Sequence, residues 1–241
     1  SLLRRLFRQF PCDGSIRSGK TVAMTVGFIM WAMSNFSGQN FALCGKTIES
    51  LRRNVTSNLP VWLAGVFSFK EHRTENKIVV GANGKSNSFY LFGGKDESSA
   101  ALIQGITLAG ILLDEVALMP ESFVNQATAR CSVEGAKLWF NCNPEGPSHW
   151  FYTKWVLEAS RRKMLHLHFT MDDNLSLSEA IKARYRSMYT GVFYQRYIKG
   201  LWAVAEGLIY TMLTDDNLYT DQERPVALKN TAMKAITVDY G

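Results

Sequence analysis

The sequence has few cysteines, and their spacing argues against a C-x-x-C site and against a cysteine metal site. The chain of 241 residues contains four of them, with no C-x-x-C pair and no spacing typical of metal ligands. We therefore expect reduced thiols that are mostly buried as small apolar side chains. These cysteines are Cys12, Cys44, Cys131 and Cys142.

The sequence also lacks a long hydrophobic run and a signal-peptide pattern. The apolar stretch at residues 22–33 is too short to span a bilayer, and Thr25 interrupts it. We expect a soluble protein that is not secreted and has no membrane partner. Because the chain begins at Ser1 and not at a methionine, we expect that some N-terminal sequence is missing.

Internal repeats, low-complexity tracts and heptad runs are absent as well. Hydrophobic residues make up 46% and charged residues 20%, which is typical of one large globular domain or of a domain plus part of another. The formal net charge of +6 is compatible with an anionic partner such as a nucleic acid or a nucleotide. Many other enzymes are equally basic, so charge alone does not select a function.

Short β-forming apolar runs alternate with helical patterns, which predicts an α/β fold with a mostly parallel sheet flanked by helices. Expected strands lie at 7–12, 41–44, 106–113 and 137–140, a hairpin within 67–92, and helices at 20–33, 49–58 and 121–130. Later segments predict a strand at 165–169, helices at 177–189 and 191–198, a loop-like stretch from 206 and a strand at 235–238. This last strand has no partner left in the sequence, so we interpret it as the start of a second domain.

Residues 14–21 match the phosphate-binding pattern G-x-x-x-x-G-K-[ST] at every fixed position, between a predicted strand and a predicted helix. Glycines let successive backbone N–H groups face a phosphate, while the Lys20 ammonium can reach the β- and γ-phosphates and the Thr21 hydroxyl can ligate Mg²⁺. The predicted phosphate-binding residues are Gly14, Ser15, Ile16, Arg17, Ser18, Gly19, Lys20 and Thr21. A second G-K-T triplet at 45–47 has Asn40 where the loop glycine belongs, and we expect it in a strand-to-helix turn.

An apolar strand delivers two adjacent carboxylates, Asp114 and Glu115, at its predicted C-terminal end. Together with the phosphate loop, this pattern predicts that Asp114 holds Mg²⁺ and that Glu115 polarises the attacking water as a general base. The alternative is a strand that ends in a solvated acidic turn. Asp followed by Glu favours an ATPase over a GTPase switch.

Two further polar groups follow or lie within predicted strands. Asn141 and Asn143 follow the strand at 137–140 and could sense the γ-phosphate, although asparagine is also common in ordinary turns. His166 and His168 share one side of a predicted strand. We favour packing or hydrogen bonding over metal binding for this pair, because no third ligand can be named.

In this order, these features resemble the large terminase subunit of tailed bacteriophages, especially its PBSX-like group. Further matching stretches lie at 51–54, 114–120, 141–152, 171–174, 191–196 and 200–207. The resemblance implies an additional-strand, RecA/terminase-like P-loop ATPase domain over 1–205 with a small lid subdomain at about 160–205. It also implies a linker at 206–234 and, at 235–241, the first strand of an RNase H-like nuclease.

The resemblance also implies roles for particular residues. Asp239 would be the first metal ligand of the nuclease, in a site that this chain leaves incomplete, so we expect the chain alone not to cut DNA. Asn141 departs from the Thr or Ser that usually begins the coupling motif. The implied assignments are phosphate and metal binding by Lys20 and Thr21, metal binding by Asp114, catalysis by Glu115 and Arg17, coupling by Asn141 and Asn143, and adenine contacts by Gln9 and Phe10.

The implied function is an ATP- and Mg²⁺-dependent motor that moves double-stranded DNA into a procapsid. Its partners would be a portal protein, a small terminase subunit and further copies in a ring, in the host cytoplasm and transiently on the procapsid. The alternatives are a helicase-like or DNA-repair ATPase, and a nucleotide-dependent DNA-binding or scaffold protein with little turnover. Candidates for an arginine acting on a neighbouring subunit are Arg52, Arg53 and Arg130; candidates for DNA contacts are Arg161, Arg162, Lys163, Lys182, Arg184 and Arg186. A structural or surface role is the alternative for each.

Overall fold

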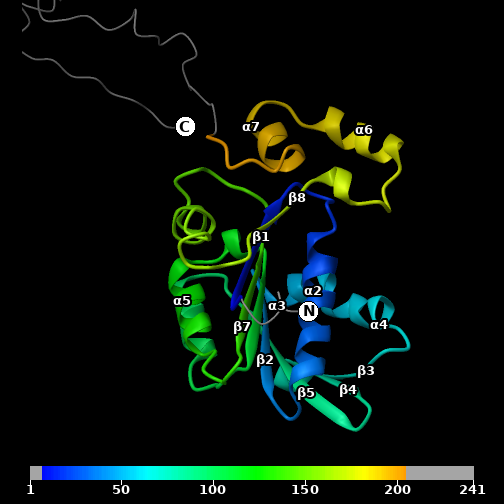
Figure 1. Ribbon diagram of the computed structural model, residues 1–241, viewed down its shortest axis with the longest axis vertical. Helices are drawn as coiled ribbons and strands as arrows, with labels where there is room; N and C mark the ends of the chain where they lie inside the picture. Colours follow the sequence, from blue (N-terminus) through cyan, green and yellow to red (C-terminus); the bar gives the residue numbers. More distant parts are fainter. Residues whose placement is uncertain (1–6, 205–241) are drawn as a thin grey trace, which may run out of the picture. The chain divides into compact units, whose positions relative to one another are not determined.

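The computed structural model describes residues 7–204, in which eight strands form one sheet in the order β3-β4-β5-β2-β6-β7-β1-β8 (Figure 1). The six strands from β5 to β8 in this order pair in parallel, and β3 and β4 extend the sheet as an antiparallel edge. The strands are β1 Gln9–Gly14, β2 Asn40–Gly45, β3 Ser68–His72, β4 Lys77–Ala82, β5 Lys85–Gly93, β6 Gly110–Asp114, β7 Lys137–Asn141 and β8 Leu167–Phe169. The predicted α/β class with a mostly parallel sheet is confirmed.

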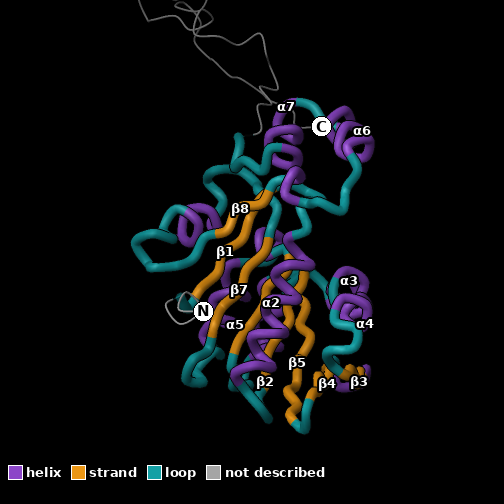
Figure 2. Tube along the Cα trace, turned by 45° about the vertical axis from the view of Figure 1, so that its right-hand side comes forward, coloured by secondary structure: helices purple, strands orange, loops and turns teal. Residues whose placement is uncertain are grey.

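Helices cover both faces of the sheet. On one face lie α2 (Lys20–Asn35), α3 (Ile48–Asn54) and α4 (Leu59–Trp62), and on the other lies α5 (Glu121–Ala129) (Figures 1 and 2). Each face has its own cluster of buried apolar side chains. No helix among residues 7–204 is long and apolar enough to cross a membrane.

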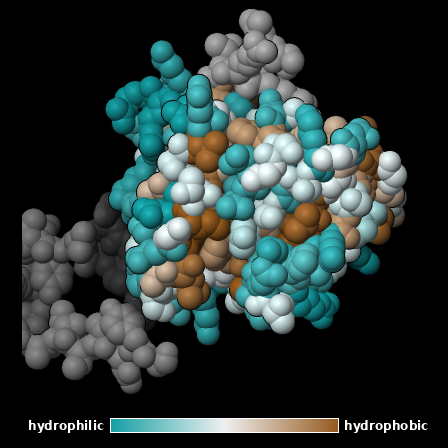
Figure 3. Space-filling view, turned by 90° about the horizontal axis from the view of Figure 1, so that it is seen from below, coloured by the Kyte–Doolittle hydropathy of each residue, from teal (hydrophilic) through white to brown (hydrophobic). Residues whose placement is uncertain are grey.

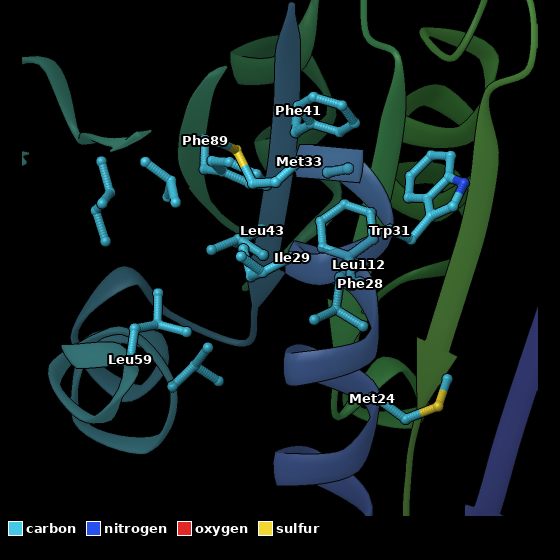
Figure 4. Packing of buried hydrophobic residues seen from close by; sticks show 14 of the residues in the cluster. Met24, Phe28, Ile29, Trp31, Met33, Phe41, Leu43, Leu59, Phe89 and Leu112 are labelled. Atoms are coloured by element: carbon cyan, nitrogen blue, oxygen red, sulfur yellow. The ribbon is translucent and has the colours of Figure 1, made fainter. Parts of the chain in front are cut away.

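Aromatic residues fill the core between α2 and the sheet. Phe28 of α2 lies edge-on to Phe41 of β2, with ring centroids 5.9 Å apart, and Phe41 stacks on Phe89 of β5 at 5.0 Å (Figure 4). All three side chains are fully buried, and contacts of this geometry stabilise a core beyond the area they remove from water. Two apolar side chains of α2, Val22 and Met30, are exposed, at 41% and 42%.

The ends of several elements differ from the sequence prediction for identifiable reasons. The strand predicted at 106–113 begins only at Gly110, because Leu108 N donates to the carbonyl oxygen of Arg130 and not to a strand, while Ala109 N still donates to Asn40 O of β2. The first strand extends to Gly14 although it contains Pro11. Pairing with β8 begins only after the proline, so its missing N–H leaves no gap in that ladder.

The segment after β7 adds the edge strand β8 and several short helical elements. It comprises the π-helical turn Tyr152–Val156, β8, the helices α6 (Glu179–Met188) and α7 (Gly191–Phe193), and a second π-helical turn at Tyr194–Ile198. Figure 2 shows α6 and α7 above the end of β8, and we refer to residues 170–200 as the lid. The face at the opposite end of the described domain is polar with small, scattered apolar areas (Figure 3).

Candidate nucleotide site

The phosphate loop joins β1 to α2 and has the backbone that its glycines predict. Gly14 and Gly19 have φ values of 137° and 87°, and Arg17 also lies in the left-handed region, at 57°. Gly19 is the N-cap of α2 and supplies no side-chain cap, so the free N–H groups of the first turn face the loop. A cavity of about 360 Å³ opens here, lined by Ile16, Arg17, Ser18, Gly19, Lys20, Thr21, Val22, Glu115, Asn143 and Asn174.

Lys20 is buried at the base of this cavity. Its Nζ donates to the carbonyl oxygen of Ser15 at 2.7 Å, to that of Gly14 at 3.2 Å, to Ser18 Oγ at 3.3 Å and to Asn143 Oδ1 at 3.0 Å. Burial lowers the pKa of the Lys20 ammonium from its ordinary value. The structure therefore brings two predicted site residues, Lys20 and Asn143, into direct contact.

Thr21, Asp114 and Asn141 form a second polar group beside the lysine. Thr21 Oγ1 donates to Asp114 Oδ1 at 3.2 Å, and Asn141 Nδ2 donates to Thr21 Oγ1 at 2.9 Å and to Asp114 Oδ1 at 2.5 Å. The strand register explains the contact, because Asp114 at the end of β6 pairs with Asn141 at the end of β7. Burial and the neighbouring Glu115 raise the pKa of Asp114 to about 6, although the bonds from Thr21 and Asn141 oppose that shift.

Glu115 lines two cavities. It lines the one over the phosphate loop and a second of about 150 Å³ that extends toward Tyr189 and Tyr197 of the lid. Its φ of 59° and ψ of 43° place it in the left-handed region, which residues with side chains rarely adopt and which is enriched at functional sites. The sequence did not predict this conformation.

Arg17 contacts the lid and is exposed. Its Nε donates to the Tyr185 hydroxyl at 3.0 Å, with the guanidinium 5.5 Å from the ring centroid, and its carbonyl accepts from Asn174 Nδ2 at 2.7 Å. Tyr185 and Asn174 were not predicted as site residues. Asn174 belongs to one of the stretches that carried the family resemblance, whereas nothing in the sequence pattern pointed to Tyr185.

The structure does not bring Gln9 and Phe10 to the phosphate loop. They lie at the opposite end of β1, and four residues of strand separate Phe10 from Gly14 by about 13 Å. Phe10 is 7% exposed and stacks on Trp139 with centroids 4.6 Å apart, while Gln9 lines a different cavity of about 250 Å³. Asp239, predicted as a nuclease ligand, lies outside the described residues.

The two histidines of the predicted H-x-H pair bind a buried carboxylate, which confirms their hydrogen-bonding role. Asp13 Oδ1 accepts from His168 Nδ1 at 2.7 Å and from His166 Nε2 at 3.1 Å, and Asp13 Oδ2 accepts from Trp202 Nε1 at 2.6 Å. Burial alone would raise the pKa of Asp13, but these three hydrogen bonds lower it well below its usual range. No group of three or more His, Cys, Asp or Glu side chains suited to a metal occurs within 7–204.

Several basic candidates have structural partners. Arg52 bonds to Glu71 at 3.2 Å and to Asn76 at 2.9 Å. Lys182 and Arg186 both pair with Asp172, at 3.8 Å and 2.5 Å. Three more arginines also have partners. Arg161 pairs with Glu158, Arg162 lies over the ring of Trp155, and Arg184 lies over the ring of Tyr185. The structure therefore offers no direct support for these residues as DNA or neighbour contacts.

The lid is docked directly on the phosphate loop. Ser15 N donates at 2.9 Å to the carbonyl oxygen of Phe169, the residue before the lid, and Ile16 N donates at 2.8 Å to that of Tyr197 in the lid. Gly200 makes this approach possible, because a Cβ there would lie 2.8 Å from Ser15 N and 3.0 Å from Gly14 Cα. Its φ is +70°.

We therefore expect Gly200→Ala to lower the free energy of unfolding by about 1–3 kcal/mol, through strain and through contact with backbone that cannot move aside. Urea denaturation of the wild-type and variant chains measures the change. Gly105→Ala is the matched control, since its φ is +79° but nothing lies within 4 Å of the added Cβ. Equal losses in the two variants would show that the close approach at Gly200 contributes nothing.

The loop, the acidic strand beside it and the sheet order define a P-loop NTPase. The sequence model of the family described as terminase large subunit, T4likevirus-type, N-terminal, matches residues 12–214. The chain belongs to this family of terminase large subunits, as the sequence predicted; the finer PBSX-like assignment stays a prediction.

Solved structures agree with the family assignment. The large terminase of a thermophilic bacteriophage is 61% identical with a TM-score of 0.81, over 87% of this chain and 52% of that one. The complex of the same terminase with ADP gives 58% identity, a TM-score of 0.81 and the same shares. This chain thus spans about half the length of those structures. The ATPase domain of the Thermus phage P74-26 large terminase, at 15% identity, a TM-score of 0.62 and coverage of 82% and 89%, shares the fold. A comparison with curated proteins found no match.

Proposed function

We propose that this chain is the ATP-hydrolysing motor domain of a DNA-packaging terminase, which moves double-stranded DNA into a procapsid. The observation that carries the proposal is the convergence of Lys20, Thr21 and Asn143 on one cavity at the end of a parallel sheet, with Asp114 bonded to Thr21. The family assignment favours this function over a helicase-like or repair ATPase. Glu115 at the same cavity argues against a scaffold with little turnover, because binding alone requires no general base.

The residues of the cavity fit ATP and Mg²⁺. Ser15 Oγ is buried without a hydrogen-bond partner among residues 7–204, which leaves a polar group available to a phosphate. Thr21 and Asp114 supply the oxygen ligands that Mg²⁺ prefers, and we propose that they hold it. When bound, Mg²⁺ would supply positive charge that offsets the charge of the phosphates.

We propose four further roles around the phosphates. Glu115 accepts a proton from the attacking water, since it is the carboxylate among the residues that line the cavity. Asn143, bonded to Lys20, senses the γ-phosphate through the lysine, while Asn141 orients Asp114 and Thr21. Arg17 stabilises transition-state charge and must leave Tyr185 to do so.

The finer aspects of the motor are also proposals. Contacts to DNA would go mainly to phosphates and be insensitive to sequence. The motor would act as a ring with a portal protein and a small terminase subunit, in the host cytoplasm and on the procapsid. The ATPase domain over 1–205, the linker at 206–234 and the nuclease strand at 235–241 complete the proposed organisation.

Lys20→Ala tests the nucleotide site. We expect ATP affinity measured by calorimetry with Mg²⁺ to fall about 10- to 150-fold, because hydrogen bonds from a charged group are worth about 1.5–3 kcal/mol. Lys85→Ala, at the exposed start of β5, is the control for loss of charge and should bind as wild type. Unchanged affinity in Lys20→Ala, or no ATP binding by the wild-type chain, would contradict the proposed function.

A further inference from the structure

Lys46 belongs to the G-K-T triplet that lacks the loop glycine, and the nucleotide site does not use it. It lies in the turn between β2 and α3, as predicted, where Thr47 caps α3 by accepting from Ser50 N at 3.0 Å. Its partly buried side chain spans two other loops. Nζ donates to Lys95 O at 2.8 Å and to Leu118 O at 2.7 Å. The ammonium therefore ties together three segments that are far apart in sequence.

One of these segments is the turn that presents Glu115. The short 3-10 helix Val116–Leu118 follows Glu115, and Leu118 N donates to Glu115 O at 2.9 Å to close it. Glu115 itself is held at φ 59°, a conformation that persists in a residue with a side chain only when the surroundings enforce it. Lys46 Nζ donates to the carbonyl oxygen of Leu118, the last residue of this turn.

The second acceptor of Lys46 Nζ, the carbonyl oxygen of Lys95, lies in a loop that is held by its own hydrogen bonds. Lys95 follows β5, where Gly94 N donates to Gly45 O at 2.9 Å and continues the pairing of β2 with β5. The next residue, Asp96, caps a 3-10 helix by accepting from Ser99 N at 3.2 Å. Because Lys95 O belongs to this braced loop, the two bonds from Lys46 Nζ connect the turn after β6 to it.

We propose that Lys46 is a positioning residue for Glu115: it fixes the turn after β6 so that the carboxylate faces the phosphate cavity. The inference rests on the proposed function of Glu115 as general base. It assigns Lys46 no contact with nucleotide. A general base must stay within a fraction of an ångström of its position relative to the attacking water. Loosening the turn therefore slows proton transfer but does not lower the affinity for ATP.

Lys46→Met, assayed in the full motor with DNA, separates this role from binding. We expect kcat for ATP to fall about 10- to 100-fold, while KM and the ATP affinity change less than about threefold. Lys46→Arg, which can also donate to two carbonyls, should restore most of the kcat. Lys95→Met is the matched control: it removes the same charge from an exposed side chain of the tethered loop, keeps both carbonyl acceptors and should turn over ATP as wild type.

A second readout follows the turn itself. Amide hydrogen exchange at Leu118 should be faster in Lys46→Met than in wild type and unchanged in Lys95→Met. Wild-type kcat in folded Lys46→Met, slow exchange at Leu118 in that variant, or a loss of ATP affinity as large as the loss of kcat would each overturn the inference. If Lys46→Met does not fold, Lys46→Gln replaces it; failure of both to fold would assign Lys46 to the fold and not to positioning.

The two proposals can fail separately. Wild-type turnover in Glu115→Gln would overturn the catalytic assignment on which the inference depends. Loss of turnover in Glu115→Gln together with normal turnover in Lys46→Met would overturn only the role of Lys46.

Discussion

Glu115→Gln is expected to reduce ATP turnover by the full motor about 10²- to 10⁴-fold, the usual contribution of a general base. The amide has the same size as the carboxylate but cannot take a proton from water. Glu115 lines the cavity shared by Lys20 and Thr21, so the lost group lies where the attacking water must be activated. ATP affinity should stay within about threefold of wild type, because a group that acts on the attacking water contributes mainly to kcat.

Steady-state ATPase assays with DNA and the assembled ring measure this effect, and calorimetry measures affinity. Glu134→Gln makes the same chemical change at an exposed position in the loop before β7 and should leave both values unchanged. Full activity in Glu115→Gln would show that another residue activates water. A weak rate for the isolated wild-type domain would not bear on the assignment, since neighbouring subunits and DNA are then missing.

The phosphate loop could be predicted from sequence because its chemistry is local. Gly14 and Gly19 adopt positive φ, and Lys20 and Thr21 follow at the start of a helix, so one continuous motif specifies the loop conformation and its ligands. The contact of Asp114 with Asn141 was only partly predictable. Each residue was expected at a strand end. The sheet order decides that the two strands are neighbours and that these two residues pair, and the sequence pattern did not predict that order.

Other parts of the site depend on contacts between distant segments, which periodicity cannot reveal. Tyr185 bonds Arg17 across 168 positions, and Trp202 bonds Asp13 across 189. The predicted first strand ended at residue 12, so Asp13 was not expected to be buried. The adenine contacts that the family resemblance implies for Gln9 and Phe10 stay a prediction. Both residues lie at the end of β1 away from the phosphate loop, because an extended strand separates residues only four positions apart by about 13 Å.

Asp13→Asn is the second change with a large expected effect, on stability. We expect the free energy of unfolding near pH 6 to fall by about 3 kcal/mol, because the amide presents a donor to groups that are already donors and leaves one of them unpaired. Asp13 is 1% exposed and accepts from His166, His168 and Trp202, so water cannot replace the lost bonds. Urea denaturation measures the loss. Asp172→Asn, at an exposed ion pair, is the control and should change stability by less than about 1 kcal/mol.

The difference in the free energy of unfolding between wild type and Asp13→Asn should depend on pH, which tests whether the effect is electrostatic. Asp13 has a pKa lowered in the folded state, so its contribution is complete above its unfolded pKa of about 3.9 and is lost as pH falls through the folded value. The hydrogen bond to Asp13 raises the folded pKa of His168, so that contribution is complete below the unfolded pKa of about 6.5 and is lost as pH rises through the folded value. The difference between wild type and Asp13→Asn should therefore be largest between about pH 4 and 6.5 and smaller on either side.

A difference that does not vary with pH would mean that the carboxylate acts by shape alone. The location of the effect can be checked as well. Asp13 immediately precedes the phosphate loop and holds Trp202, while Ser15 and Ile16 are bonded to Phe169 and Tyr197 of the chain around the lid. Loss of the carboxylate should therefore speed amide exchange at Ser15 and Ile16 more than in the distant β3–β4 hairpin. Faster exchange at Ser15 and Ile16 than in the hairpin would show that the stability of the phosphate loop depends on the segment after the lid, which contains Trp202.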